Sequence, residues 1–292
     1  PIPESDLARR FQPVFSALEK SRHSTLLALP YTGRTSHLRY ISAHPEIIKL
    51  PANHKIIWSE TGSQNNISAF YSEILLSLNS ELLNHTAILS KDNFLLLKEI
   101  SNQVSNLNYL PIIILTFHSS QIYFFPEIEE QFIQLTRKNP TLKILWSLDT
   151  QVFRDSQHSH PSSPIFENIH YFPTFSKNET LHSLKRITLS RNLKINPKLL
   201  EISNTNTGGI AGLFHNFLFI NSDYPTNSLT QNIIQTITNE LISAPDLSLL
   251  LTTPDCRQFI NQFHTPRYFY GPVNLFRSIS SQEISLLKFL LN

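Results

Sequence analysis

The sequence predicts an α/β protein with a three-layer core around a five-stranded, mainly parallel sheet, followed by a helical domain. Two observations predict this class. Short apolar runs alternate with longer stretches up to Phe175, which is typical of a parallel sheet with crossover helices. Beyond Phe175 no convincing strand follows. The five runs expected to form strands are 25–29, 55–58, 111–115, 142–148 and 168–172.

Helices are expected before and between these runs, where apolar residues recur at helical spacing. A polar segment that contains two prolines, 157–164, is expected to be a loop before the last strand. The predicted helices are 7–20, 67–78, 93–104 and 127–137, with a further helix directly after Gly33.

The second half begins with a helix start signal. Ser176 is a candidate N-cap, and Glu179 stands at the spacing of a capping box, which predicts a helix to about Ile187. The remaining predicted helices are 197–202, 210–220, 229–243, 247–263 and 280–291. We therefore expect an α/β domain over 1–175, a helical lid domain over 176–268, and the start of a further unit over 269–292.

Composition limits the function. The 292 residues are 40% hydrophobic and 16% charged, which indicates a globular chain with a polar surface. The net charge of +2 argues against a strong general attraction to nucleic acid, although a local basic face remains open. The single cysteine, Cys256, excludes an internal disulfide and fits a reducing compartment, so a cytoplasmic protein is expected. No apolar run reaches the ~20 residues of a membrane span, and no membrane partner is expected.

The most informative segment is the turn after the first predicted strand. It carries Gly33-Arg34-Thr35 where a P-loop carries Gly-Lys-Thr, and Ala28 stands where the first P-loop glycine belongs. Backbone amides of such a turn, together with a helix N-terminus, can bind phosphate. Arg34 would face the β- and γ-phosphates and Thr35 would be the Mg²⁺ ligand. The rest of the expected phosphate loop is Pro30, Tyr31, Thr32 and Ser36. The alternative is an ordinary β–α turn that uses glycine for the bend.

A second glycine-rich segment accompanies this turn. Residues 206–213 read Asn-Thr-Gly-Gly-Ile-Ala-Gly-Leu, which is similar to the T-G-G-x-P-x-L signature in the lid of one P-loop group. With the loop and the order of elements, it makes the chain resemble AAA+/STAND ATPases, particularly the origin-recognition-like and archaeal-type members. The resemblance implies bound ATP and Mg²⁺, a helical lid in which Gly208 and Gly209 allow close approach to the nucleotide, and a C-terminal winged helix. An arginine that contacts phosphate would be Arg154, Arg186 or Arg191.

The sequence departs from that family at the end of the third strand. The family places Asp-Glu there, to support Mg²⁺ and polarise the attacking water. Here the strand is followed by Thr116-Phe117-His118, which contains no carboxylate. His118 and Glu60 are weak replacements, as base and as compensating carboxylate respectively. At the end of the fourth strand, Ser147 or Asp149 could sense the γ-phosphate.

We therefore expect an ATP-binding, nucleotide-responsive switch with weak or absent hydrolysis. One alternative is an interaction module that has lost the nucleotide and binds DNA or a protein through its C-terminal unit. Another is an active ATPase whose acidic pair is replaced. Homo-oligomer formation stays open. His158 and His160 do not predict a zinc site, because zinc needs three or four converging ligands.

Overall fold

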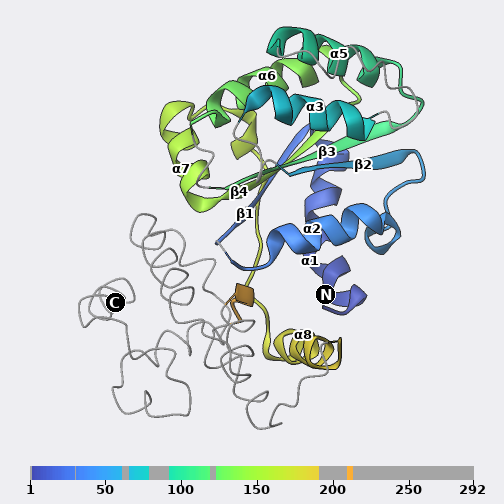
Figure 1. The fold of residues 1–292 in the computed structure, drawn as a ribbon, viewed down its shortest axis with the longest axis vertical. Helices are drawn as coiled ribbons and strands as arrows, with labels where there is room; N and C mark the ends of the chain where they lie inside the picture. Colours follow the sequence, from blue (N-terminus) through green and yellow to red (C-terminus); the bar gives the residue numbers. More distant parts are fainter. Residues whose placement is uncertain are drawn as a thin grey trace. The chain divides into compact units, whose positions relative to one another are not determined.

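The computed structural model describes residues 2–29, 31–60, 66–78, 92–118, 123–190 and 209–212 (Figure 1). The chain divides into two compact units. The first, here called the sheet unit, comprises Leu7–Leu27 and His37–His170. The second, here called the loop unit, comprises Pro1–Asp6, Ala28–Ser36 and Tyr171–Asn292. The segment predicted to bind phosphate therefore belongs to the loop unit.

Five strands form one sheet in the order β2-β3-β4-β1-β5, and β3 pairs in parallel with both β2 and β4. The predicted five-stranded α/β core is confirmed. Each strand coincides with one predicted apolar run, with ends that differ by one or two residues. The strands are β1 (His23–Ala28), β2 (His54–Glu60), β3 (Leu110–Phe117), β4 (Lys143–Asp149) and β5 (Ile169–Tyr171).

The central strands are apolar because both of their faces are covered. All six residues of β1 are buried, as are the last seven of β3 and the last six of β4. A parallel strand between two helical layers has no solvent face, so its sequence is a continuous apolar run and not an alternating one. β5 lies at the edge of the sheet and is partly exposed, which fits its short length.

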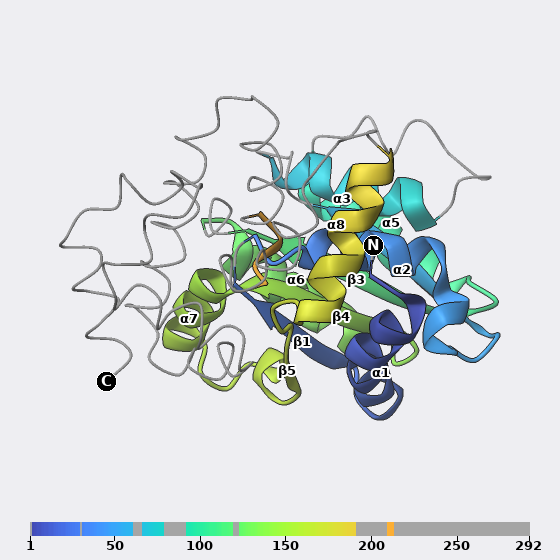
Figure 2. The same ribbon diagram turned by 90° about the horizontal axis from the view of Figure 1, so that it is seen from below.

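The helices of the sheet unit form two layers (Figures 1 and 2). α1 (Glu4–Lys20) and α2 (Arg34–Ala43) cover one face of the sheet. α3 (Ile67–Leu78), α5 (Asn93–Ser105) and α6 (Phe125–Lys138) cover the other. All five were predicted, and the three-layer arrangement is confirmed. α6 begins two residues before the predicted Glu127, because Pro126 is tolerated in the first turn of a helix.

A buried polar chain crosses the core beside Trp146. The Trp146 Nε1–H donates to His23 Nδ1 at 3.1 Å, so the ring proton of His23 is on Nε2. That Nε2–H donates to Thr136 Oγ1 at 3.0 Å, and the Thr136 hydroxyl donates to the carbonyl of Ile133 at 2.9 Å. Burial, followed by the charges of Arg22 and Arg137, lowers the pKa of His23 to about 4. The histidine is therefore neutral at pH 7, and each of its ring nitrogens has a partner.

The prediction was wrong between β4 and β5, where the structure has helix α7 (Thr150–Ser159). Its last turn lies inside the predicted loop 157–164. Val152, Phe153 and Ser156 are buried at three- and four-residue spacing. The segment is polar by composition, so its helical face is defined only by packing against β4 and α6. The loop that remains leads into a 3-10 turn, Pro164–Phe166. A second 3-10 turn, Pro45–Ile48, follows α2.

The capping box predicted at Ser176 is confirmed. The Ser176 N–H donates to Glu179 Oε2 at 2.7 Å, and the Glu179 N–H donates to Ser176 Oγ at 3.4 Å. These two bonds satisfy amide groups that a helix start otherwise leaves unpaired. Helix α8 (Lys177–Ser190) follows, and it extends three residues beyond the predicted Ile187.

Several predicted helices lie outside the described residues: 197–202, 229–243, 247–263 and 280–291. Of the helix predicted over 210–220, Ile210, Ala211 and Gly212 are described; Ala211 and Gly212 are helical, whereas Ile210 is not. Within the described ranges, no helix combines the length and hydropathy that a bilayer crossing requires.

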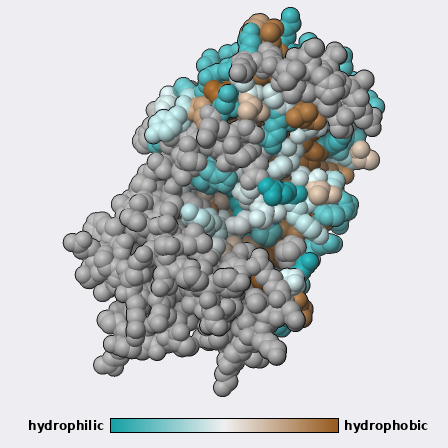
Figure 3. Space-filling view, viewed as in Figure 1, coloured by the Kyte–Doolittle hydropathy of each residue, from teal (hydrophilic) through white to brown (hydrophobic). Residues whose placement is uncertain are grey.

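On the face drawn in Figure 3, hydrophilic and hydrophobic residues are interspersed over the described part of the chain. Among the described residues, the most exposed large apolar side chains are Tyr123 at 91%, Leu189 at 81% and Phe94 at 72%, and each lies within two residues of the end of a described range. Single exposed apolar side chains are normal on a protein surface, so they do not define a binding site.

Candidate nucleotide site

The predicted phosphate loop connects β1, which ends at Ala28, to α2, which begins at Arg34. Two of its residues have left-handed backbone: Tyr31 with φ 63° and Gly33 with φ 85°. Glycine adopts this region freely, which explains its use at position 33. For a tyrosine the same region costs free energy and persists only where neighbouring groups impose it. The loop is therefore a constrained turn.

The side chain of Thr32 is buried inside the turn. This side chain is 1% exposed, and its hydroxyl donates to the carbonyl of Leu29 at 2.8 Å. Pro30 lies outside the described residues. Thr32 was predicted as a phosphate-loop residue, and the structure gives its hydroxyl an internal partner in the loop itself.

The three predicted binding residues at the start of α2 differ in exposure. Arg34, at the position of the P-loop lysine, is 3% exposed, whereas Thr35 is half-buried and Ser36 is exposed. The first amides of any helix lack intrahelical partners and carry partial positive charge, so they favour an anion. A buried guanidinium requires compensating polar or anionic groups. Cationic charge and helix amides thus occur together in the first turn of α2.

A short segment of the lid signature contacts this loop. The Gly212 N–H donates to the Tyr31 carbonyl at 2.9 Å, and the Phe175 N–H donates to the Gly209 carbonyl at 2.9 Å. Gly209 has φ 70°, and a Cβ there would lie 1.9 Å from the Phe175 carbonyl oxygen. Gly209 was predicted to allow close approach to a nucleotide; in the structure the close neighbour is the Phe175 backbone. Gly208 lies outside the described residues.

Polar residues gather where β3 and β4 end. Thr116 and Ser147 are register partners in neighbouring parallel strands, so their side chains share one face of the sheet. Both are fully buried. The Ser147 hydroxyl has no hydrogen-bond partner among the described residues. The alternation of side chains places Asp149 on that face as well. Glu60 is the register partner of Thr116, and its side chain lies outside what the structure describes.

His118 and Asp149 are brought together at this edge. His118 Nδ1 lies 3.3 Å from Asp149 Oδ2. The Asp149 side chain is 6% exposed and the His118 side chain 33%. A carboxylate on one ring nitrogen fixes the orientation of the imidazole. Sequence reasoning considered these two residues separately and missed their pairing, which depends on the neighbouring order of β3 and β4.

β1 lies beside β4 in the sheet. The helix that follows β1 covers one face of the sheet, and the helix that follows β3 covers the other (Figures 1 and 2).

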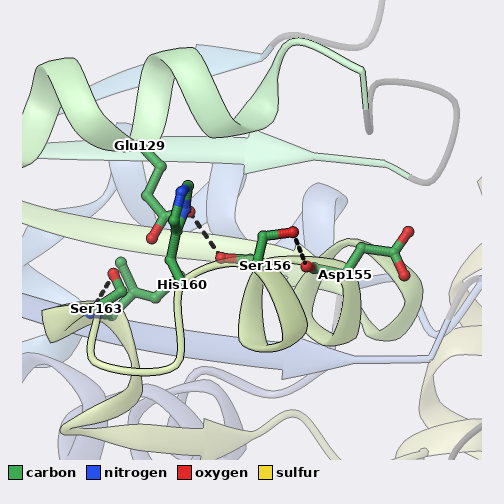
Figure 4. Close-up of polar contacts among 7 residues, drawn as sticks. Glu129, Asp155, Ser156, His160 and Ser163 are labelled. Atoms are coloured by element: carbon green, nitrogen blue, oxygen red, sulfur yellow. Dashed lines mark hydrogen bonds and ion pairs between the residues drawn. The ribbon is translucent and has the colours of Figure 1, made fainter.

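Mg²⁺ prefers oxygen ligands, and it commonly takes only one or two of them from the protein because nucleotide phosphates and water supply the rest. The half-buried hydroxyl of Thr35 fits that need. Among the described residues, no group of three histidine, cysteine or carboxylate side chains could hold a metal ion. This includes the neighbourhood of His160, whose Nδ1 lies 3.7 Å from Glu129 Oε2. Figure 4 shows these two side chains directed toward one another, with the Asp155 side chain directed away.

The predicted phosphate-contacting arginines are only partly located. Arg186 is on α8 and is exposed. The side chain of Arg154, on α7, and the whole of Arg191 lie outside what the structure describes. The choice among the three therefore stays a prediction.

No protein-family model matches the sequence, and no curated protein matches it. Solved structures do match. The Orc1 protein of Aeropyrum pernix, determined in complex with DNA, is 15% identical with a TM-score of 0.53, and the match covers 99% of this chain and 84% of that one. A Walker-type ATPase of Pyrococcus abyssi is 14% identical with a TM-score of 0.55, over 100% and 89%. Cdc6p of Pyrobaculum aerophilum is 15% identical with a TM-score of 0.51, over 99% and 80%.

These matches define the fold. The five-stranded sheet with a loop from β1 into α2 is the fold of a P-loop NTPase. More narrowly, the chain shares its fold with Orc1 and Cdc6p, in line with the origin-recognition-like resemblance that its loop and glycine-rich segment predicted.

Proposed function

We propose that this protein is an ATP-binding, nucleotide-responsive switch with weak or absent hydrolysis. The observation that carries the proposal is the turn at Tyr31 and Gly33, which leads directly into α2 with Arg34 and Thr35 in the first turn. Such a turn presents backbone amides and a helix N-terminus to an anion. Arg34 supplies the positive charge, and Thr35 supplies a hydroxyl to Mg²⁺.

Weak hydrolysis follows from the end of β3. Thr116 and Phe117 stand where the family that the sequence resembles places its Asp-Glu pair. Neither a hydroxyl nor a phenyl ring can accept the proton of the attacking water, and without the first carboxylate the metal loses a supporting charge. The switch would then respond to the presence of nucleotide through the lid, for which we propose residues 176–268.

A thermal-shift titration with Mg-ATP tests nucleotide binding. At 100 times its dissociation constant, ATP stabilises the protein by about 2.7 kcal/mol. The Arg34→Ala and Thr35→Ala variants should lose this stabilisation. Ser42→Ala is a matched control on the last turn of the same helix, where the serine hydroxyl donates to the Arg39 carbonyl of that helix at 2.8 Å. No shift in the intact protein refutes the proposal, and a shift retained by both loop variants places ATP elsewhere.

A measurement of steady-state phosphate release tests the third hypothesis, that the protein is an active ATPase. The pairing of His118 with Asp149 at 3.3 Å is the observation in its favour, because a fixed imidazole could accept a proton. We expect release at background. Turnover that is lost in both Thr35→Ala and His118→Ala would instead assign hydrolysis to this pair.

DNA binding through the C-terminal part is the second candidate function. It is favoured by the match to Orc1 of Aeropyrum pernix, which was determined on DNA. We propose that residues 269–292 begin a winged helix. Binding should weaken steeply with salt if it depends on phosphate contacts. Affinity that does not change with salt would exclude this mode. We also propose that the protein is cytoplasmic and that it can form homo-oligomers.

A further inference from the structure

We propose that Gly212 is a positioning residue for phosphate binding, because its N–H fixes the Tyr31 carbonyl and thereby presets the neighbouring Thr32 amide. The inference rests on the proposed nucleotide function and adds to it a link between the lid signature and the loop. All residues involved belong to the loop unit.

The Gly212 N–H donates to the Tyr31 carbonyl oxygen at 2.9 Å. The peptide group between Tyr31 and Thr32 is planar and trans, so its C=O and N–H point in opposite directions. When the Tyr31 carbonyl is held on Gly212, the Thr32 N–H must point away from the 209–212 segment. Within the part of the chain that the structure describes, this N–H bonds to no backbone carbonyl.

The orientation of the Tyr31–Thr32 peptide is imposed by neighbouring groups and is not intrinsic. Tyr31 has φ 63°, which a tyrosine rarely adopts without external constraint. On its other side the peptide is held by Thr32, whose buried hydroxyl donates to the Leu29 carbonyl at 2.8 Å. The peptide is therefore fixed by Gly212 on one side and by Leu29 on the other. Without the Gly212 bond, one of these two constraints is lost and the turn can relax.

The segment that carries the Gly212 donor is itself held in place. The Gly209 carbonyl accepts from the Phe175 N–H at 2.9 Å, with backbones so close that a Cβ would not fit. Ile210 is 2% exposed and Ala211 6%. Phe175, which holds the Gly209 carbonyl, is followed directly by Ser176, the capped start of α8. Movement of the lid segment would release the Tyr31 carbonyl, so phosphate affinity depends on where that segment lies.

The test compares two substitutions at one position in the full chain. Gly212→Pro removes the N–H, whereas Gly212→Ala keeps it. The left-handed glycines among the described residues are Gly33 and Gly209, so a side chain at position 212 carries no penalty from a left-handed backbone. It also lies in the first described turn of a helix, where proline is tolerated. The two variants therefore differ mainly in whether the backbone N–H at position 212 is present.

Two quantities are measured. A hydrogen bond to a charged group is strong enough that its loss should weaken Mg-ATP binding by roughly 10- to 100-fold in Gly212→Pro, with little change in Gly212→Ala. The second readout is the ¹⁵N–¹H signal of Thr32 in threonine-labelled protein. ATP should move it downfield in the wild type and in Gly212→Ala, but not in Gly212→Pro at saturating ATP. If Gly212 had only a structural role, a Gly212→Pro protein that still binds ATP would also still show the downfield shift of the Thr32 amide signal.

The outcomes are distinct. Equal ATP affinity of the two variants, or a Thr32 shift retained in Gly212→Pro, overturns this inference while the nucleotide function stands. No binding by the wild type overturns both. If Gly212→Pro does not fold, the scalar coupling across the Gly212–Tyr31 hydrogen bond is measured in the wild type. It should persist when ATP shifts the Thr32 amide, and its loss on ATP binding overturns the inference.

Discussion

The buried His23 should make the stability of the sheet unit fall steeply in mild acid. In the folded protein the pKa of His23 is about 4, against an ordinary value of 6.5. Below pH 6.5 the unfolded chain binds a proton that the folded chain excludes. Unfolding is therefore favoured as pH falls from 6.5 toward 4, and the stability is fully present above 6.5.

The magnitude follows from the shift. A lowering of about 2.5 pKa units corresponds to about 3 kcal/mol at 1.36 kcal/mol per unit. His23 is only 6% exposed, so solvent screening reduces this little. The main cause of the lowered pKa is burial, followed by the charges of Arg22 and Arg137. In addition, an imidazolium carries a proton on Nδ1, which then cannot accept the Trp146 N–H. A loss of this size is a large fraction of the stability of a typical domain.

The assay is urea unfolding at pH 7.5 and pH 4, followed by tryptophan fluorescence, for the wild type and His23→Gln. The glutamine carbonyl can accept from Trp146, but the side chain does not titrate. The wild type should lose about 3 kcal/mol more than the variant over this interval. His54 and His170, whose pKa values burial also lowers, are present in both proteins and cancel. Equal losses in wild type and variant, or an NMR pKa near 6.5 for His23, would refute the reasoning.

Three further substitutions should change stability, each measured by urea unfolding. Gly209→Ala should cost more than ~2 kcal/mol, because its Cβ would lie 1.9 Å from the Phe175 carbonyl oxygen at φ 70°. Ser156→Ala should cost about 1–3 kcal/mol, because it removes the hydroxyl that donates to the buried Glu129 carboxylate at 2.7 Å. Ser176→Ala should cost about 1 kcal/mol through loss of the capping box of α8.

Matched control variants distinguish these specific effects from a nonspecific loss of stability. Gly212→Ala adds the same methyl group outside the left-handed region and should stay within ~0.5 kcal/mol of wild type. Ser190→Ala, at the exposed end of α8, should do the same. Adding Glu129→Leu to Ser156→Ala should recover stability, since no charge then stays buried. A neutral Gly209→Ala, an equal cost at both α8 serines, or no recovery in the double variant would contradict the respective argument.

The apolar patterns of the sequence were sufficient for the core. A strand covered on both faces must be apolar throughout, so the runs that became β1, β3 and β4 could be read directly. Helix α7 could not be read in this way. Its buried residues include Ser156, and a polar residue reveals its burial only when the Glu129 partner on α6 is in place. Likewise the His118–Asp149 pair joins residues 31 positions apart, and it exists because β3 and β4 are neighbours.

The sequence by itself determined the α/β order, the turn before α2 and the absence of carboxylates after β3, because these depend on local spacing and residue type. Only the tertiary structure decided how the turn is held. Tyr31 gives no sign in the sequence of its left-handed backbone, and Gly212 gives none of its bond to the Tyr31 carbonyl. Backbone hydrogen bonds between distant segments do not depend on side-chain identity, so no residue pattern records them.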